Sequence, residues 1–134
     1  MESWRPKNLI LILAREFASK LAIPMVMIDA DANVVFFNEP AEELLGTSFA
    51  EAAQLSEPEW ERLMRACDLD GNPLSLAQMP VGVALHEMRP VHLSFTLNER
   101  LVDATAFPLL ASRTELVGAV ALFWERNGAG GHPR

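Results

Sequence analysis

Among the side chains of the types from which catalytic or cofactor sites are built, Cys67, His86 and Asp103 are the main candidates in this sequence. Cys67 is the only cysteine, so neither an internal disulfide nor a cysteine-rich zinc site can form. Asp68 follows it directly, and a neighbouring negative charge disfavours the reactive thiolate, so we expect a small buried filler. The three histidines lack the spacing of metal ligands, and we predict no metal site.

Asp103 lies in a mostly apolar segment, where a carboxylate needs a partner. Arg100 and Arg113 are candidate partners, and an exposed position at a strand end is the alternative. A buried Asp base, as in an isomerase, is the one enzyme hypothesis that the sequence supports. No recognisable triad, dyad or metal cluster accompanies Asp103. We therefore predict no catalytic residue and no enzymatic activity.

The stretch from Ile23 to Gly46 has the clearest structural pattern. Two apolar runs, Met25–Ile28 and Val34–Phe37, flank a turn of Asp and Asn residues, whose side chains bond to nearby backbone amides. Asn38 can cap the helix that follows, and Gly46 can end that helix in the left-handed conformation. The stretch therefore predicts a hairpin followed by a short capped helix.

This order of elements resembles the opening of a PAS domain, the small sensor module of signalling proteins. The matching residues are Asp29, Asn38, Ala41, Glu43, Leu44, Leu45 and Gly46. The glycine of the family's turn is replaced by Ala32-Asn33, and Asn tolerates the left-handed conformation. Phe49 to Cys67 is helical in character, and Asp68–Pro73 and Ser75–Met88 resemble the loop and the F helix of the family. The resemblance covers residues 23 to 125.

The resemblance implies an α+β fold, in which a five-stranded antiparallel sheet has short helices on one face and an N-terminal helix on the other. Val91–Leu97 alternates apolar and polar residues, and Leu101–Leu110 follows after a hairpin-length connection. Leu116–Trp124 is apolar throughout, so we expect it mid-sheet with both faces covered. We therefore divide the chain into an N-terminal helix (residues 1–22), a PAS domain (23–125) and a disordered tail (126–134).

The composition restricts the classes of partner. The 134 residues fit one domain with one core, and the net charge is −7. Nucleic-acid binding needs clustered basic residues, so we expect no nucleic-acid partner. No uncharged apolar run approaches the ~20 residues needed to cross a bilayer, so we expect no membrane span. We predict a cytoplasmic protein.

The expected N-terminal helix, residues 6 to 21, is apolar on more than one face. Ile10, Leu13, Phe17 and Leu21 form a stripe at helical spacing, and this stripe is the expected cover of the sheet. A helix with apolar groups around it usually has more than one burial partner. The second partner is the same helix of another copy, or the helix is wholly buried in its own domain. The residues that we assign to a homodimer interface are Leu9, Ile10, Leu13 and Phe17.

The resemblance also implies the function, a non-enzymatic sensory module that mediates protein interaction. Its partners would be a second copy, a signalling protein in trans or a small apolar ligand. A small apolar-ligand carrier or receptor is the alternative function. From alternation and the family layout, the residues expected to line a ligand pocket are Met27, Phe36, Leu45, Met64, Met79, Val83, Leu93, Phe95, Phe107, Val120 and Leu122.

The resemblance supplies two cofactor hypotheses, haem and flavin. Haem-binding PAS domains take an axial histidine from the F helix, where His86 is the candidate, but His86 and Arg89 resemble the polar exit of a helix. Flavin-binding PAS photosensors carry a reactive cysteine in an Asn-Cys-Arg motif, and the residues around Cys67 lack that motif. We therefore expect no cofactor.

Overall fold

The computed structural model describes residues 6–52 and 56–126. Along the chain the elements are α1 (Pro6–Ala18), β1 (Met25–Asp29), β2 (Val34–Phe37), α2 (Glu39–Leu45), α3 (Phe49–Ala52), α4 (Glu57–Met64), β3 (Ala66–Cys67), the 3-10 turn η1 (Leu76–Gln78), α5 (Pro80–Glu87), β4 (Val91–Leu97), β5 (Arg100–Ser112) and β6 (Glu115–Glu125). Of the disordered tail expected over residues 126–134, residues 127–134 lie outside the described residues, whereas Arg126 is described and bonds to Asp103. Part of the helical segment expected between Phe49 and Cys67 also lies outside them.

One antiparallel sheet organises the fold, with the strand order β2-β1-β6-β5-β4-β3. The predicted α+β class is confirmed, as is the central position of β6 between β1 and β5. The sheet has a sixth strand because the two residues of β3 pair with the end of β4, Ala66 opposite Leu97. So short a strand has no detectable period in the sequence.

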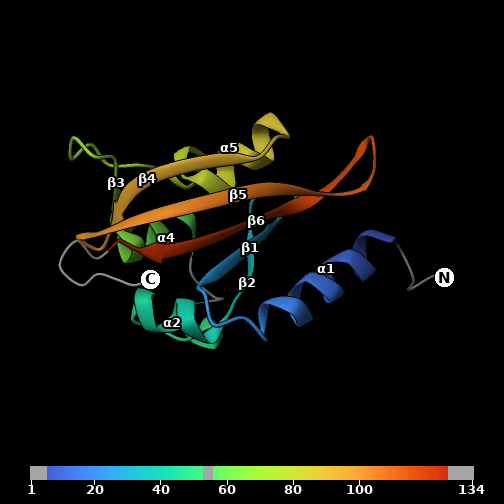
Figure 1. The fold of residues 1–134 in the computed structure, drawn as a ribbon, viewed down its shortest axis with the longest axis horizontal. Helices are drawn as coiled ribbons and strands as arrows, with labels where there is room; N and C mark the ends of the chain where they lie inside the picture. The colour runs from blue at the N-terminus through green and yellow to red at the C-terminus, as the bar shows by residue number, and fades with distance from the viewer. Residues whose placement is uncertain (1–5, 53–55, 127–134) are drawn as a thin grey trace.

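The two faces of the sheet pack against different elements. The α5 helix and α1 lie on opposite sides of the β5–β6 hairpin (Figure 1). On the inner face, α2 to α5 enclose the larger apolar core, to which β6 contributes Ala119, Ala121 and Phe123. On the outer face, Val120 of β6 packs with Met25 and Met27 beneath α1. Strand β6 is thus covered on both sides, as its continuous apolar sequence predicts.

The helix α1 meets the sheet through a different stripe from the one expected. Leu11, Ala14, Ala18 and Leu21 pack on the outer-face cluster, whereas Leu13 and Phe17 point away from it. Of the stripe predicted to cover the sheet, Ile10, Leu13, Phe17 and Leu21, only Leu21 packs on this cluster, so the prediction is wrong for Leu13 and Phe17. Two small alanines on the sheet side let the helix backbone approach the strands closely, and apolar periodicity alone gives such small residues little weight.

Asn38 joins α1 to the hairpin and to α2, and it is 2% exposed. Its Oδ1 accepts hydrogen bonds from the backbone N–H of Met25 (3.0 Å) and of Ala41 (3.2 Å). Its Nδ2 donates to the carbonyl oxygens of Ala18 (3.0 Å) and Ile23 (2.9 Å). The predicted helix cap is confirmed, and the same side chain also fixes the end of α1.

Two loops of the fold have the same design. The Oδ1 atoms of Asp29 and Asp68 each accept hydrogen bonds from the backbone N–H groups two and four residues later, at 2.9 Å. The fourth residue of each loop has a positive φ, +68° at Ala32 and +91° at Gly71. Ala32 therefore carries backbone strain that Gly71 avoids.

Candidate functional site

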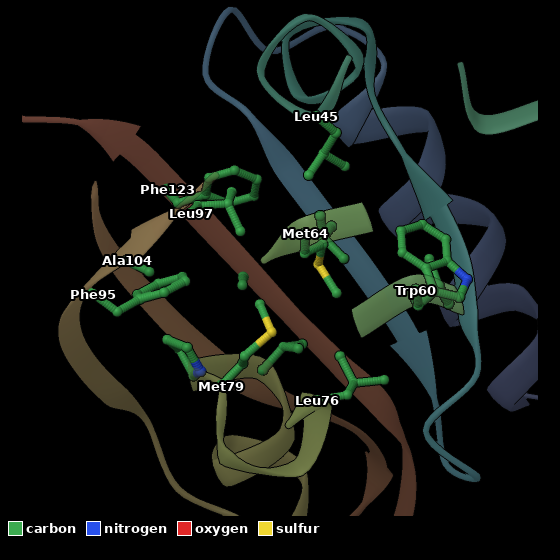
Figure 2. A pocket seen from close by; sticks show the side chains of 14 residues that line it. Leu45, Trp60, Met64, Leu76, Met79, Phe95, Leu97, Ala104 and Phe123 are labelled. Atoms are coloured by element: carbon green, nitrogen blue, oxygen red, sulfur yellow. The ribbon is translucent and has the colours of Figure 1, made fainter. Parts of the chain in front are cut away.

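On the inner face, a small apolar cavity lies between the sheet and the helices (Figure 2). The space open to the centre of a water molecule is about 30 Å³. The lining residues come from strands β1, β2, β4, β5 and β6 and from the segments around α2, α4, η1 and α5. They are Val26, Val34, Leu45, Trp60, Met64, Leu76, Met79, Pro80, Val81, Phe95, Leu97, Ala104, Ala121 and Phe123.

Four of the residues expected in a ligand pocket lie in this lining, namely Leu45, Met64, Met79 and Phe95. Val83 and Leu93 are half-buried but lie outside the lining. Met27, Phe36, Phe107, Val120 and Leu122 pack in the outer-face cluster beneath α1, so their assignment to the inner pocket is wrong. The physical reason is the pleat: in strands that are apolar on both faces, alternation does not tell which residues point inward.

Sequence reasoning missed most of the wall. Ala104, Ala121 and Phe123 belong to strands β5 and β6 and point toward the cavity, while the residues next to them in the chain face the outer side of the sheet. Trp60 lies one helical turn before Met64 on α4, and this spacing was the available signal. Trp60 packs edge-on against Phe37, with ring centroids 5.6 Å apart.

The candidate cofactor residues of the sequence, His86 and Cys67, lie outside this cavity. His86 is exposed near the end of α5 and Cys67 is half-buried in β3, and neither lines the inner cavity. A haem in this cavity would therefore have no histidine ligand from His86, which lies instead beside a separate hollow lined by Ala32, Leu76, Ala77, Gly82 and Leu85. Within residues 6–52 and 56–126, no three His, Cys, Asp or Glu side chains come together as metal ligands.

Asp103 forms a polar cluster on the outer face of the sheet with Ser94 and Arg126. Ser94 Oγ donates to Asp103 Oδ1 at 2.5 Å. Arg126 donates through Nη2 to Oδ1 at 2.6 Å and through Nε to Oδ2 at 3.0 Å. The hydrogen bonds from Arg126, and then that from Ser94, hold the pKa of Asp103 below its usual value. A carboxylate held ionised by these partners is structural in character.

The expected partners of Asp103 are therefore corrected. Arg126, which directly follows β6, takes the place of Arg100 and Arg113. Arg100 instead lies 3.8 Å from a carboxylate oxygen of Glu125. Because Asp103 is mid-strand on β5 and 9% exposed, the alternative of an exposed strand end is also wrong. Asp103 faces away from the cavity that would hold a substrate, so the geometry gives no support to the isomerase-base hypothesis.

The exposed face of α1 is the second candidate site. Leu9, Ile12, Leu13 and Phe17 are 38%, 62%, 58% and 61% exposed. Leu9, Leu13 and Phe17 recur every four residues, so they form one row along the helix. Ile10, the remaining residue assigned to a dimer interface, is half-buried. Beside this row, a shallow groove is lined by Leu11, Ile12, Arg15, Met27, Val35 and Phe36.

None of the helices described in residues 6–52 and 56–126 has the length and apolar character needed to span a bilayer.

Comparisons with solved structures identify the fold. The PAS domain of BvgS from Bordetella pertussis superposes with a TM-score of 0.64 at 18% identity, over 87% of this chain and 86% of that one. A fungal LOV domain photoreceptor gives 0.55 at 20% identity, over 89% and 92%. The PAS domain of nitrogen regulation protein NR(II) from Vibrio parahaemolyticus gives 0.50 at 18%, over 82% and 95%. No protein-family model and no curated protein matches the sequence.

Proposed function

We propose that this chain, whose fold is that of a PAS domain, is a non-enzymatic sensory module that acts through protein interaction in the cytoplasm. Its partner is a second copy of the chain, bound through the exposed row of α1. The fold follows from the similarity to solved PAS domains. The interaction rests on the surface of α1, as follows.

The single observation that carries the proposal is the apolar surface of α1. Ile12, Leu13 and Phe17 each leave more than half of the side chain in water although the opposite side of the helix is packed on the sheet. Contiguous exposed apolar groups on a soluble protein mark interaction sites. The row therefore supports an interface that the isolated chain leaves uncovered.

The charge of α1 is compatible with a second copy as the occupant. The chain carries a net charge of −7, whereas residues 6–22 contain three basic side chains and one acidic side chain, Glu16. Glu16 is paired with Lys20, and the Arg15 guanidinium lies 4.9 Å from the centroid of the Phe36 ring. Two copies that meet through α1 therefore keep the acidic remainder of each chain out of the contact, and the small positive charge of the two helices adds only weak repulsion.

A two-fold interface needs a self-complementary surface. The α1 row offers protruding side chains, and the groove beside it, between α1 and β2, offers an apolar recess. The helix α1 has 13 residues and is about 20 Å long. Two α1 helices packed together would therefore bury less than the ~800 Å² per partner of a standard interface. We therefore expect a weak, reversible dimer.

Sedimentation velocity over roughly a hundredfold range of concentration tests the proposal. Leu13→Glu places a charge in the middle of the row, and Leu69→Glu makes the same change at a leucine that is 63% exposed on the Asp68 loop. Wild type and Leu69→Glu should shift from monomer to dimer as the concentration rises, while Leu13→Glu should stay monomeric. A wild type that is monomeric throughout would contradict the second copy as partner and would favour a signalling protein in trans.

A second candidate function is that of a small-ligand sensor, and the inner cavity favours it. The cavity lies between the sheet and α4, α5 and the η1 segment. A molecule bound there would press on both layers and so shift the population of their relative positions. Native mass spectrometry of the purified chain tests this function: a co-purifying small molecule supports it, and a clean apo mass opposes it.

A further inference from the structure

The wall of the inner cavity has a uniform chemistry. Its fourteen side chains include no charge, hydroxyl or amide, and the indole N–H of Trp60 is the single polar group among them. In Figure 2 the Trp60 nitrogen lies on the side of the ring turned away from the middle of the cavity. A bound molecule would therefore find no side-chain hydrogen-bond partner at its centre.

The polar groups buried in the described part of the chain are engaged elsewhere. Asn38 uses both ends of its amide on Ala18, Ile23, Met25 and Ala41. Asp103 uses both carboxylate oxygens on Ser94 and Arg126, on the other face of the sheet. Neither side chain can turn toward the cavity without breaking these bonds, each of which is worth about 1 kcal/mol or more.

The size of the cavity limits its occupant. Its 30 Å³ exceeds the ~10–15 Å³ that a single water needs, but a buried water also needs two to four polar partners. Since the wall lacks these partners, an apolar occupant is favoured over water. Met64 and Met79 reach into the lining from α4 and from the residue before α5 (Figure 2), and such unbranched side chains readily change shape around an occupant.

From these observations we propose that the cavity binds a small, uncharged molecule without hydrogen-bonding groups, no larger than a single hydrocarbon ring. The inference rests on the sensory function proposed above and specifies its ligand class. It excludes carboxylic acids, flavins and haem from this cavity, because their polar edges would be buried without partners. Met64 and Met79 form the adjustable part of the wall.

The test uses benzene, phenol and benzoate as probes of equal ring size. Chains labelled at the methionine methyl groups are titrated by NMR, so that ring currents report where each probe binds. Benzene should shift the methyl signals of Met64 and Met79 and leave those of Met25 and Met27, on the outer face, unchanged. Phenol should bind at least about tenfold more weakly, because its hydroxyl has no partner, and benzoate should not bind.

Two results would overturn the inference: phenol or benzoate binding as tightly as benzene, or benzene leaving the signals of Met64 and Met79 unmoved up to its solubility limit. Ala121→Val narrows the cavity from β6 and should weaken benzene binding at least tenfold. If this variant fails to fold, the comparison of probes in the wild-type chain still decides. The same titration on Leu13→Glu separates the two proposals, because this variant should be monomeric. Benzene binding by Leu13→Glu supports the ligand class whether or not two copies pair, and sedimentation of the wild type decides the interface.

Discussion

Replacing Asn38 by Asp is the most discriminating single change in this protein. Asp caps helices as well as Asn does, and a negative charge is favourable at a helix N-terminus. Capping alone therefore predicts that Asn38→Asp is neutral or stabilising. The structure predicts a large loss, because the Nδ2 atom that donates to Ala18 and Ile23 becomes an oxygen.

The magnitude follows from the contacts. Asn38→Asp keeps the two bonds that Oδ1 accepts from Met25 and Ala41, and it removes the two that Nδ2 donates. Two lost hydrogen bonds cost about 1 kcal/mol each, and the site, which is 2% exposed, adds the cost of a carboxylate oxygen facing two carbonyl oxygens. We expect the free energy of unfolding to fall by about 3 kcal/mol.

Urea denaturation followed by circular dichroism measures this loss. Because Asn38 ties down the end of α1, trypsin should also cleave at Arg15 and Lys20 faster in the variant under native conditions. Ser56→Asp is the matched control: Ser56 caps the exposed start of α4, and we expect a change within about 0.5 kcal/mol. An Asn38→Asp chain as stable and as trypsin-resistant as the wild type would refute the role given to Asn38.

Three further predictions concern stability and are measured by the same urea denaturation. Ala32→Gly should stabilise the chain by about 0.5–1 kcal/mol and Gly71→Ala should destabilise it by about 1 kcal/mol, because both positions have positive φ. A Cβ at Gly71 would meet no neighbouring atom, so the loss there would report backbone strain alone. A change of the same sign in the two variants would contradict the strain at Ala32. Gly118→Ala should lower the free energy of unfolding by roughly 3 kcal/mol or more, because the added Cβ would lie 2.1 Å from the carbonyl oxygen of Ile28 in the adjacent strand. A loss under about 1 kcal/mol would contradict this, since it would mean that β1 and β6 move apart at little cost. Asp103→Asn should cost about 1–3 kcal/mol at pH 7. Because the pKa of Asp103 is lowered on folding, this difference should persist above its unfolded pKa of about 3.9 and shrink as the pH falls below it; a difference independent of pH would count against the ion pair with Arg126.

The parts of the fold that the sequence predicted correctly depend on local signals. The turn that begins at Asp29, the Asn38 cap and the Gly46 helix end are set by residues within a few positions of one another. The continuous apolar run of β6 correctly indicated a strand covered on both faces. These local patterns were sufficient for the PAS resemblance that the structural comparisons support.

The parts that failed depend on long-range geometry. Whether Val120 or Ala121 points into the cavity is decided by the register of β1 and β6, and no pattern within an all-apolar strand encodes it. The partner of Asp103 lies 23 residues away, brought into place by the pairing of β5 with β6. The face of α1 that meets the sheet was missed because two of the four contacting residues, Ala14 and Ala18, are small alanines.

Disulfide cross-linking at the centre of the α1 row tests the account's central claim most directly. In a Cys67→Ser background, Leu13→Cys places a thiol at the middle of the row, and Leu69→Cys places one at an equally exposed leucine elsewhere. A disulfide forms only where the two Cα atoms approach to about 4.4–6.8 Å. We predict a covalent dimer, under mild oxidation, from the chain with a thiol at position 13 and none from the chain with a thiol at position 69. Equal cross-linking of the two chains, or none of either, would contradict the claim that α1 is where two copies meet.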